Sequence, residues 1–387
     1  MRVLLVNHVA ALGGAERSLL DLAGTLVAEH DHEIILACPQ GPLAEASIGG
    51  GAIHQAIPAV RLRRPSWRHP LRPTGAARLP AARQILRRIV SDTAPDCIHA
   101  NSLTAMLMLG GIRTSPLIWH VRDLALHPGV ARRAAARARA IVAISPTVER
   151  HLNSVLPQSL QARITCIMNG IPIPDSAAFP PRHEARRSLG LPPEVPLVGM
   201  LAHMTPWKRH DRMIELATRL APTYPQARFV IAGGDLFGEH AAYLHSLHNL
   251  AAQNGVADRV IFMGATDTPL LLLRALDVLA HPAADEPFGR VICEAMAVGT
   301  PVVALNRGGP ADILRHGETG WLADVDAPAS LAEGVARLLD DEALRTRLSA
   351  NAADAVRRDF DIRTTAAALA RLWEAAACQP GRVVKAT

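Results

Sequence analysis

Aromatic residues and lysines are both scarce in this sequence. Phe, Trp and Tyr make up 3% of the 387 residues, whereas proteins that bind single-stranded nucleic acid stack its bases on aromatic side chains. The scarcity of aromatics therefore argues against that kind of nucleic-acid binding. Only Lys208 and Lys385 are lysines, so nearly all of the positive charge is carried by arginine.

The excess positive charge lies in the first half of the chain. Residues 1–180 hold 19 arginines against 11 acidic residues, and the remainder is close to balance. An arginine-rich half suits phosphate groups or an anionic membrane surface, although basic surfaces are often only solvated. The charge therefore admits an anionic partner without identifying one.

Cysteines and long hydrophobic runs are also few. The five cysteines are isolated, with no Cys-x-x-Cys pair, which indicates small core residues in a reducing compartment and not disulfides or metal ligands. No apolar run approaches the ~18 residues that span a bilayer. Asn7 and His8 interrupt the first apolar run, which we interpret as a buried strand and not as a signal peptide. We expect a cytoplasmic protein, at most peripheral on the inner face of the membrane.

Short apolar runs alternate with helical segments twice along the chain. This pattern predicts an α/β protein with parallel sheets covered on both faces, and the length exceeds what one core usually holds. The stretch Ile171–Pro181 contains four prolines and interrupts the alternation, so it is the best linker. We therefore predict two Rossmann-like domains, the first covering residues 1–172 and the second beginning at 182, with a binding site in the crevice between them.

The stretch Asp285–Gly299 carries the most specific pattern in the chain. Glu286 follows a predicted strand, and Glu294 lies about one turn into the helix that begins after Gly289. Carboxylates can bind hydroxyl groups, and a helix N-terminus between them suits a phosphate, so the stretch predicts a nucleotide-sugar site. Either glutamate alone could instead compensate the helix dipole or lie on a solvated face.

Other polar residues follow predicted strands, where ligands bind in such sheets. His120 ends one strand and Lys208 follows the first strand of the second domain, while Gly13 and Gly14 precede a helix and Asn101 is a weaker candidate. A glycine loop lets backbone approach a phosphate or an acceptor, and a lysine can neutralise a diphosphate. The alternatives are a structural histidine, a solvated lysine and glycines that pack the loop on the sheet. No Gly-x-Gly-x-x-Gly motif and no P-loop occur.

Together these motifs resemble the family 4 glycosyltransferases, which are retaining enzymes of the GT-B fold. The resemblance covers nearly the whole chain and is most specific in the second domain. It implies two Rossmann-like domains facing across a cleft, the second covering 182–359, and a C-terminal crossover helix within 360–387 that returns to the first domain on the acceptor side. The matching motifs are Gly13–Glu16, Asn169–Pro172, Glu286–Gly289 with Glu294–Ala297, Gly299–Ala304, Gly308–Pro310 and Gly317–Leu322.

The resemblance also implies roles for individual residues. Glu294 would bind the ribose of the donor nucleotide, Glu286 the transferred sugar and Lys208 the diphosphate, while His120 would lie beside the sugar. Glu286, Lys208 and His120 are the predicted catalytic residues. The predicted donor-binding set is His203, Lys208, Glu286, Phe288, Gly289, Arg290, Val291 and Glu294, and the predicted acceptor or phosphate loop comprises Gly13, Gly14 and Asn101.

His203 departs from the family pattern. An arginine that shares the diphosphate with the lysine is implied where this chain has a histidine. A neutral imidazole stabilises a diphosphate less, although a neighbouring phosphate can raise the pKa of a histidine and keep it charged. The sequence Asp324-Val325-Asp326 resembles the Asp-x-Asp metal motif of other sugar transferases, but a helix start expected at Pro328 favours a capping role. We expect neither a metal nor a cofactor, with a nucleoside diphosphate sugar as co-substrate.

The expected activity is transfer of a hexose from a nucleoside diphosphate donor to a hydroxyl acceptor with retention, in cell-surface polysaccharide, lipopolysaccharide or glycolipid synthesis. A nucleotide-sugar epimerase of the same architecture and a non-catalytic nucleotide-sugar-binding partner remain as alternatives. The expected acceptor is a sugar or a lipid-linked sugar. The segment Arg61–Arg88 holds nine arginines and could contact an anionic membrane, or it could be a solvated loop and helix.

Overall fold

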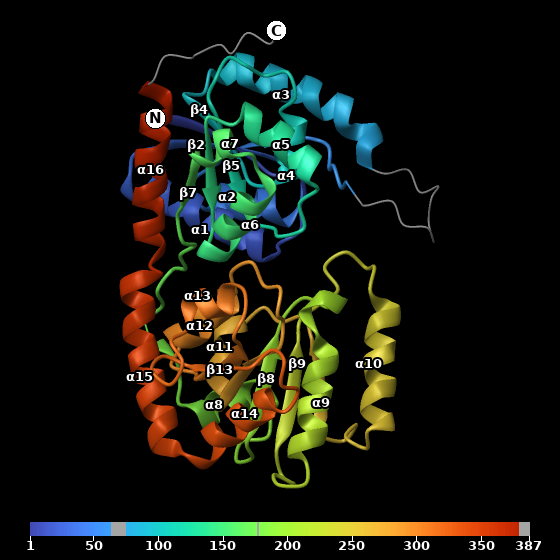
Figure 1. Cartoon of the computed structure of the whole chain (residues 1–387). Coiled ribbons are helices and arrows are strands. Elements are labelled where there is room, and N and C mark those ends of the chain that lie inside the picture. Colours follow the sequence, from blue (N-terminus) through green and yellow to red (C-terminus); the bar gives the residue numbers. More distant parts are fainter. Residues whose placement is uncertain (63–74, 176–177, 379–387) are drawn as a thin grey trace. The chain divides into compact units, whose positions relative to one another are not determined.

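The computed structural model describes residues 1–62, 75–175 and 178–378, and the chain divides into two compact units (Figure 1). Unit 1 comprises Met1–Gly170 together with the chain from Ile362 onward, and unit 2 comprises Ile171–Asp361. Unit 1 is therefore built from both ends of the chain.

A parallel sheet forms the middle of unit 1. Its seven described strands are ordered β3-β2-β1-β4-β5-β6-β7, and neighbouring strands are parallel. The order runs outward in both directions from β1 and β4, as in Rossmann folds. The strands are β1 (Arg2–Val6), β2 (Glu33–Cys38), β3 (Ile53–Ala56), β4 (Cys97–Ala100), β5 (Leu117–Val121), β6 (Ala140–Ala143) and β7 (Ile164–Cys166).

Helices cover this sheet because the strands are apolar on both faces. Residues of α1, α2 and α16 share one hydrophobic cluster with β1, β2, β4, β5 and β6, while α4, α5 and α6 pack on β4, β5 and β6. The helices of unit 1 are α1 (Gly14–Glu29), α2 (Pro42–Gly49), α3 (Leu79–Thr93), α4 (Leu103–Met108), α5 (Pro128–Arg137), α6 (Pro146–Val155), α7 (Gln158–Gln161) and α16 (Ile362–Cys378), with a 3-10 turn at Gly75–Arg78.

The last helix, α16, is the most distant element in sequence that unit 1 contains. It packs against α1 and contributes Leu369 and Trp373, both fully buried, to the core of unit 1. The preceding helix, α15, belongs to unit 2. The prediction that the C-terminal helix returns to the first domain is therefore confirmed.

Unit 2 repeats the same topology. Its six described strands are all parallel and are ordered β10-β9-β8-β11-β12-β13, which places β8 and β11 where the order reverses. The strands are β8 (Leu197–Leu201), β9 (Arg228–Ala232), β10 (Val260–Gly264), β11 (Val278–His281), β12 (Val302–Leu305) and β13 (Trp321–Ala323).

Two groups of helices pack around the sheet of unit 2. Residues of α9, α10, α14 and α15 share one hydrophobic cluster with the strands, and α8, α11 and α12 pack in a second group. The helices are α8 (Arg182–Ser188), α9 (His210–Leu220), α10 (Ala241–Gln253), α11 (Pro269–Ala275), α12 (Arg290–Ala297), α13 (Gly309–Ile313), α14 (Ser330–Asp340) and α15 (Glu342–Asp359), with a 3-10 turn at Pro206–Lys208.

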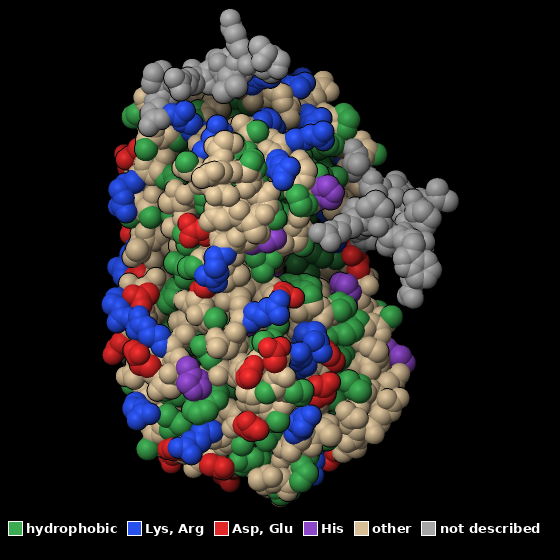
Figure 2. All heavy atoms as spheres, viewed as in Figure 1, with side chains coloured by type: hydrophobic (Ala, Val, Ile, Leu, Met, Phe, Trp, Pro, Cys, Tyr) green, Lys and Arg blue, Asp and Glu red, His purple; other side chains and the backbone are tan. Residues whose placement is uncertain are grey.

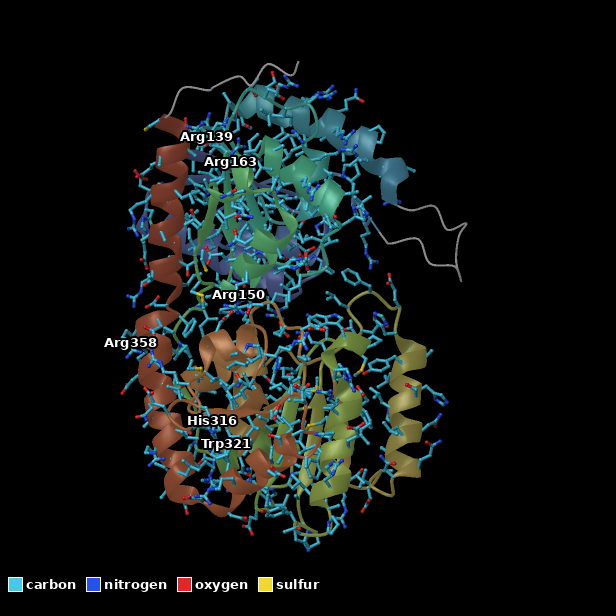
Figure 3. All side chains as sticks on the ribbon, viewed as in Figure 1. Arg139, Arg150, Arg163, His316, Trp321 and Arg358 are labelled. Atoms are coloured by element: carbon cyan, nitrogen blue, oxygen red, sulfur yellow. The ribbon has the colours of Figure 1, made fainter. Side chains whose placement is uncertain are left out.

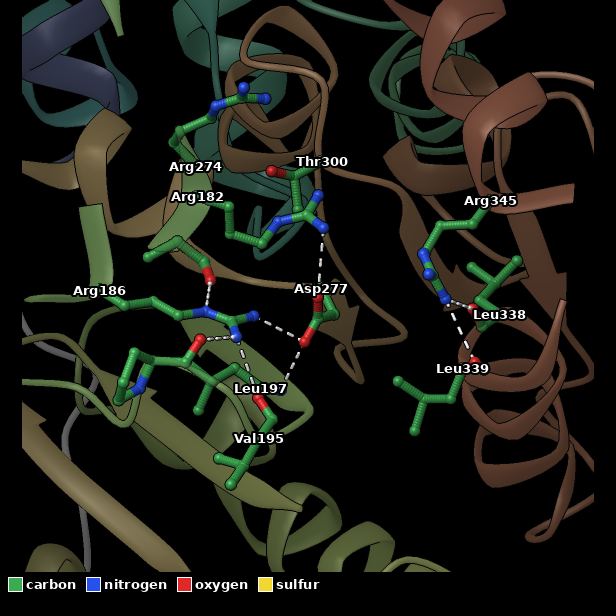
Figure 4. A network of polar contacts seen from close by, with 12 residues as sticks. Arg182, Arg186, Val195, Leu197, Arg274, Asp277, Thr300, Leu338, Leu339 and Arg345 are labelled. Carbon is green, nitrogen blue, oxygen red and sulfur yellow. Dashed lines mark hydrogen bonds and ion pairs between the residues drawn. The ribbon is translucent and has the colours of Figure 1, made fainter. Parts of the chain in front are cut away.

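A buried arginine ties α8 to the sheet of unit 2 (Figure 4). The guanidinium of Arg186 donates to the carbonyls of Ala275, Pro193 and Val195 at 2.8, 3.0 and 3.0 Å, and to Asp277 at 2.7 Å. The same Asp277 carboxylate accepts the backbone N–H of Leu197 at 2.7 Å. Since Leu197 begins β8 and Asp277 directly precedes β11, this network fixes the amino ends of the two central strands.

Charged side chains are distributed differently on the two units. On the face in Figure 2, Lys and Arg side chains predominate over unit 1, and basic and acidic side chains mix over unit 2. Within unit 2, His316 and Trp321 lie side by side, with ring centroids 4.5 Å apart (Figure 3). No helix in the described part of the chain is long and apolar enough to cross a membrane.

Candidate active site

The site in unit 2 forms where the strand order reverses. Ligands bind at this point in open parallel sheets, because the loops after the two central strands diverge and leave a crevice at their carboxyl ends. Lys208 lies in the 3-10 turn after β8, and Glu286 lies in the loop after β11. The topology therefore brings together two residues that the sequence analysis identified separately.

Lys208 and Glu286 form an ion pair in which Lys208 Nζ donates to Glu286 Oε2. His281, the last residue of β11, places its Nε2 3.4 Å from the same oxygen. Burial alone would raise the pKa of Glu286, but the charges and hydrogen bonds of Lys208 and His281 outweigh that effect and lower the pKa to about 2. Glu286 is therefore ionised at neutral pH and can only accept hydrogen bonds.

The backbone around Lys208 holds the ammonium group in place. Arg209 adopts the left-handed conformation at φ 60°, which is uncommon for a residue with a side chain and often marks a functional site. Its guanidinium donates to Asp211 at 2.7 and 3.0 Å, which stabilises this turn before α9. On the other side, Lys208 Nζ lies 4.1 Å from the centroid of the half-exposed Trp207 ring. The Lys208 ammonium thus contacts both the Trp207 ring and the Glu286 carboxylate.

The loop that carries Glu286 is fixed by a glycine. The Gly309 N–H donates to the Glu286 carbonyl at 2.7 Å. A Cβ at Gly309 would lie 2.0 Å from the Phe288 carbonyl oxygen, so only glycine permits this approach. Phe288 is buried, and its ring centroid lies 6.2 Å from that of Phe360. The Gly308–Pro310 loop after β12 thus packs against the loop that carries Glu286 and supports it.

Helix α12 begins directly after this loop. Gly289 precedes it with φ 102°, a conformation that favours glycine, and its backbone turns the chain into the helix. In the first turn of the helix, Val291 is partly exposed, and Arg290 Nε donates to Glu294 Oε1 at 2.7 Å. The amino end of this helix and its dipole suit a phosphate.

His203 lies in the loop between β8 and Lys208 and is partly buried. The neighbouring Met204 N–H donates to the Gly234 carbonyl at 3.0 Å, so this loop packs on the loop after β9. The structure therefore places His203 at the carboxyl end of β8, on the same loop as Lys208.

Unit 1 carries a second polar cluster at its own point of strand reversal. Asn101 follows β4, and Asn7 follows β1. Asn101 Nδ2 donates to Asn7 Oδ1 at 3.1 Å. Arg122, after β5, donates to Asn101 Oδ1 at 2.6 Å and to Asn169 Oδ1 at 3.2 Å. All four side chains are buried, and the network connects the loops after β1, β4 and β5 to Asn169, near the end of the first segment of unit 1.

His120 is buried at the end of β5 and faces two partners. Its Nδ1 lies 3.0 Å from His99 Nε2 and 3.3 Å from Arg122 Nη2. Burial, reinforced by the charge of Arg122, lowers the pKa of His120 well below its usual value and that of His99 to about 3. Both imidazoles are therefore neutral at physiological pH.

The glycine loop before α1 is held by a buried glutamate. The Gly13 N–H donates to Glu16 Oε2 at 3.2 Å, and Asn7 Nδ2 lies 3.4 Å from Glu16 Oε1. Burial raises the pKa of Glu16. A Cβ at Gly14 would meet no atom within 4 Å, so packing of the loop on the sheet does not explain that glycine.

Several neighbours of the candidate residues escaped the sequence analysis. His281 received no role there, although a polar residue at the carboxyl end of a strand is itself a signal. His99 and Trp373 carried no local signal, because their contacts depend on tertiary packing. The capping interpretation of Asp324 and Asp326 was wrong: Asp324 Oδ1 accepts the Asp326 N–H at 3.0 Å and closes a turn, while α14 begins at Ser330 and not at Pro328.

Comparison with known proteins identifies the relatives of both units. Residues 181–355 match the family model "Glycosyl transferases group 1", and residues 12–173 match "Glycosyltransferase Family 4". A lipopolysaccharide core biosynthesis mannosyltransferase of Rhizobium meliloti is 29% identical over 66% of this chain and 79% of its own. A D-inositol 3-phosphate glycosyltransferase of Corynebacterium efficiens is 35% identical over 50% of this chain and 46% of its own. The chain thus matches less than half the length of that second relative.

The same architecture occurs in a solved structure. The HepE protein of Anabaena, in a complex with UDP-glucose, superposes with a TM-score of 0.80 at 23% identity, over 97% of this chain and 100% of its own. Two Rossmann-like units and a returning C-terminal helix define a protein of the GT-B fold. Because the two family models together match most of both units, the chain belongs to the family 4 glycosyltransferases.

Proposed function

We propose that the protein transfers a hexose from a nucleoside diphosphate sugar to a hydroxyl acceptor, with retention at the anomeric carbon and without a metal ion. The observation that carries this proposal is the buried Lys208–Glu286 pair at the strand reversal of unit 2, directly before the first turn of α12. It combines a cation and the amino end of a helix for phosphate with a carboxylate for sugar hydroxyls.

Each part of the cluster suits one part of the donor. Lys208, His203 and the N–H groups of Gly289 and the first turn of α12 would neutralise the diphosphate. Glu286, ionised and buried, would accept hydrogen bonds from the hydroxyls of the transferred sugar. Glu294 would bind the ribose hydroxyls. Its bond to Arg290 holds the carboxylate in one orientation.

The reaction requires one bond to break and one to form on the same face of the sugar. The bond from the anomeric carbon to the diphosphate oxygen breaks, and the bond to the acceptor oxygen forms. The acceptor proton passes to the departing diphosphate oxygen. Glu286 is less suited to act as a covalent nucleophile, because Lys208 and His281 already engage its Oε2 and hold its pKa near 2.

The relatives suggest the donor and the pathway. The Anabaena structure contains UDP-glucose, and the Rhizobium relative is a mannosyltransferase of lipopolysaccharide core biosynthesis. We therefore propose a sugar or lipid-linked sugar as acceptor, in cell-surface polysaccharide or lipopolysaccharide synthesis. Membership of a glycosyltransferase family favours transfer over epimerisation.

A panel of nucleoside diphosphate sugars, assayed for release of the nucleoside diphosphate, tests the proposal. We expect slow hydrolysis of one donor without acceptor and faster release with a suitable sugar acceptor. Glu294→Ala should abolish turnover and leave the circular dichroism spectrum unchanged. Full activity in that variant would contradict the proposed site. Conversion of the donor to its epimer would indicate an isomerase, and tight nucleotide binding without turnover would indicate a non-catalytic partner.

A peripheral membrane contact through Arg61–Arg88 extends this proposal. Residues 63–74 lie outside the described residues. Within α3, Arg83 donates to the Leu107 carbonyl at 3.1 Å and Arg87 to the Gly110 carbonyl at 3.4 Å, so these two arginines hold the end of α4. Arg78 and Arg88 are exposed and available for anionic lipid. Liposome sedimentation at low and moderate salt should show salt-sensitive binding only with anionic lipid. Binding without that dependence would contradict a charge-driven contact.

A further inference from the structure

We propose that His99 and Trp373 position His120 by fixing its tautomer, so that its Nε2–H is directed as a hydrogen-bond donor toward an oxygen of the bound sugar substrate. The proposal rests on the proposed function for the identity of the ligand. It concerns residues on three elements, namely β4, β5 and the C-terminal helix α16.

The pleat of the sheet brings these residues together. Alternate residues of a strand point to the same face, and Cys97 of β4 and Ile118 of β5 belong to the hydrophobic cluster covered by α1 and α16. His99 and His120 each lie two residues further on and therefore face the same helices. Trp373 of α16 meets them there, with its ring centroid 5.4 Å from that of His99.

The hydrogen bonds that link Trp373, His99 and His120 allow only one assignment of donors and acceptors. The indole N–H of Trp373 is a donor and cannot accept, so His99 Nδ1, 3.2 Å away, is the acceptor. The proton of the neutral His99 ring therefore lies on Nε2. That N–H donates to His120 Nδ1 at 3.0 Å. His120 in turn must carry its own proton on Nε2.

Arg122 supports the same tautomer through a contact longer than the bond from His99. A guanidinium can only donate, and Arg122 Nη2 lies 3.3 Å from His120 Nδ1. Two donors thus address one lone pair of His120, and a proton on Nδ1 would have to displace both. The cation nearby also disfavours a charged imidazole. His120 is therefore neutral and cannot serve as a general base through Nδ1.

The other ring nitrogen has no such partner. His120 is 1% exposed, and among the described residues its Nε2 forms no hydrogen bond. Buried N–H groups are almost always paired, and an unpaired one costs free energy that a ligand oxygen would recover. Since β5 ends at Val121, this N–H lies at the carboxyl end of the sheet, where substrates bind in such folds. An oxygen of the sugar is the acceptor that the proposed reaction supplies.

The tautomer can be observed without an activity assay. The long-range 15N–1H NMR spectrum of the full chain labelled with 15N-histidine distinguishes Nδ1–H, Nε2–H and doubly protonated rings, and His120→Gln assigns the signal. We expect the wild type to show Nε2–H alone for His120 between pH 6 and pH 8. A ring protonated on Nδ1, or a doubly protonated ring, would overturn the proposal even if no donor were ever found.

Trp373→Phe tests the positioning because it removes the indole N–H that donates to His99 Nδ1. We expect Nδ1-protonated rings to appear in the NMR spectrum and kcat/KM for transfer to fall about ten-fold. Trp119→Phe is the matched control, because Trp119 is equally buried, precedes His120 in β5 and has an indole N–H without a partner among the described residues. We expect it to leave both readouts unchanged.

The double variant separates positioning from packing. Gln at position 120 offers a side-chain N–H without a tautomer, so Trp373→Phe should have no further effect on kcat/KM in the His120→Gln background. An equal loss in both backgrounds, or an unchanged His120 signal in Trp373→Phe, would reduce Trp373 to a packing residue and overturn the proposal.

Discussion

Lys208 Nζ donates to Glu286 Oε2, although the two residues are 78 positions apart in the sequence. Both side chains are largely buried, with 14% and 9% of their surfaces exposed. A buried pair of this kind keeps two charges in fixed positions without substrate, which is the arrangement that stabilises charge developing in a transition state. The ion pair thus links the fold of unit 2 to its proposed chemistry.

Removing the lysine should destabilise the protein as well as inactivate it. Lys208→Met leaves Glu286 buried with His281 alone, and breaking a buried pair costs about 3–5 kcal/mol. The double variant Lys208→Met/Glu286→Gln should regain most of this stability and none of the turnover. Urea unfolding and nucleoside diphosphate release measure the two effects.

A surface pair provides the control for this comparison. Arg357 Nη1 lies 3.4 Å from Asp354 Oδ1, and both side chains are exposed. Arg357→Met should therefore change the free energy of unfolding by about 0.5 kcal/mol or less. A Lys208→Met variant as stable as Arg357→Met would show that the Lys208–Glu286 pair is not formed in solution.

Gly309→Ala should impair the donor site, although Gly309 is not one of the residues proposed to bind the donor. Its Cβ would lie 2.0 Å from the Phe288 carbonyl oxygen, so the loop that carries Glu286 must move. We expect a loss of stability of about 1–3 kcal/mol and a loss of turnover on the order of 100-fold. Gly24→Ala in α1 is the control, because its Cβ would meet open space and a helix favours alanine. Equal kinetics for the two variants would contradict the supporting role of Gly309.

The sequence predicted the fold class and much of the candidate site. Apolar runs located the strands because both sheets are parallel and buried, and the residues after them pointed to Lys208, Glu286 and His120. Its failures have a physical cause. The contacts of His281 and His99 are with residues that only the strand order brings close. Nothing near Trp373 in the sequence indicates that it bonds to a histidine in another element.

Helix boundaries and local turns were predicted less well for a different reason. Asp324 and Asp326 precede a helix in the sequence, but the Asp324 carboxylate accepts the Asp326 N–H and caps no N–H of α14. The bond from Asp324 to the start of α14 runs the other way, from its backbone N–H to the Ser330 hydroxyl. A short polar side chain near a helix start can close a turn or cap the helix, and the sequence does not distinguish the two.

His203→Arg should keep or raise turnover. The arginine implied by the family pattern would add a permanent charge on the loop that carries Lys208, and a guanidinium binds phosphate oxygens more strongly than a neutral imidazole. Calorimetric titration with the active donor measures the effect on affinity. His245→Arg on the exposed face of α10 makes the same change of charge away from the site and should leave affinity unaltered. A loss of donor binding confined to His203→Arg would count against the assignment of His203 to the diphosphate.

The stability of the protein should fall between pH 7 and pH 5 because of its buried histidines. Burial lowers the pKa of His99 to about 3 and that of His210 to about 4. The unfolded chain therefore binds protons below about pH 6.5 while these folded side chains stay neutral, and the free energy of unfolding decreases as the pH falls. Each such histidine contributes a loss of about 2 kcal/mol between pH 7 and pH 5.

His210→Gln isolates one of these contributions. The variant should lower the pH 7 to pH 5 loss by about 2 kcal/mol, whereas His245→Gln, at an exposed position, should leave the loss unchanged. Glu286 contributes almost nothing to this loss: its depressed pKa of about 2 adds stability above the ordinary pKa of a glutamate, and this stability disappears only as the pH falls from about 4.5 toward 2. Urea unfolding at pH 7 and pH 5 therefore measures the histidines without Glu286. A loss between pH 7 and pH 5 that His210→Gln leaves unaltered would show that His210 is not held neutral in the folded protein.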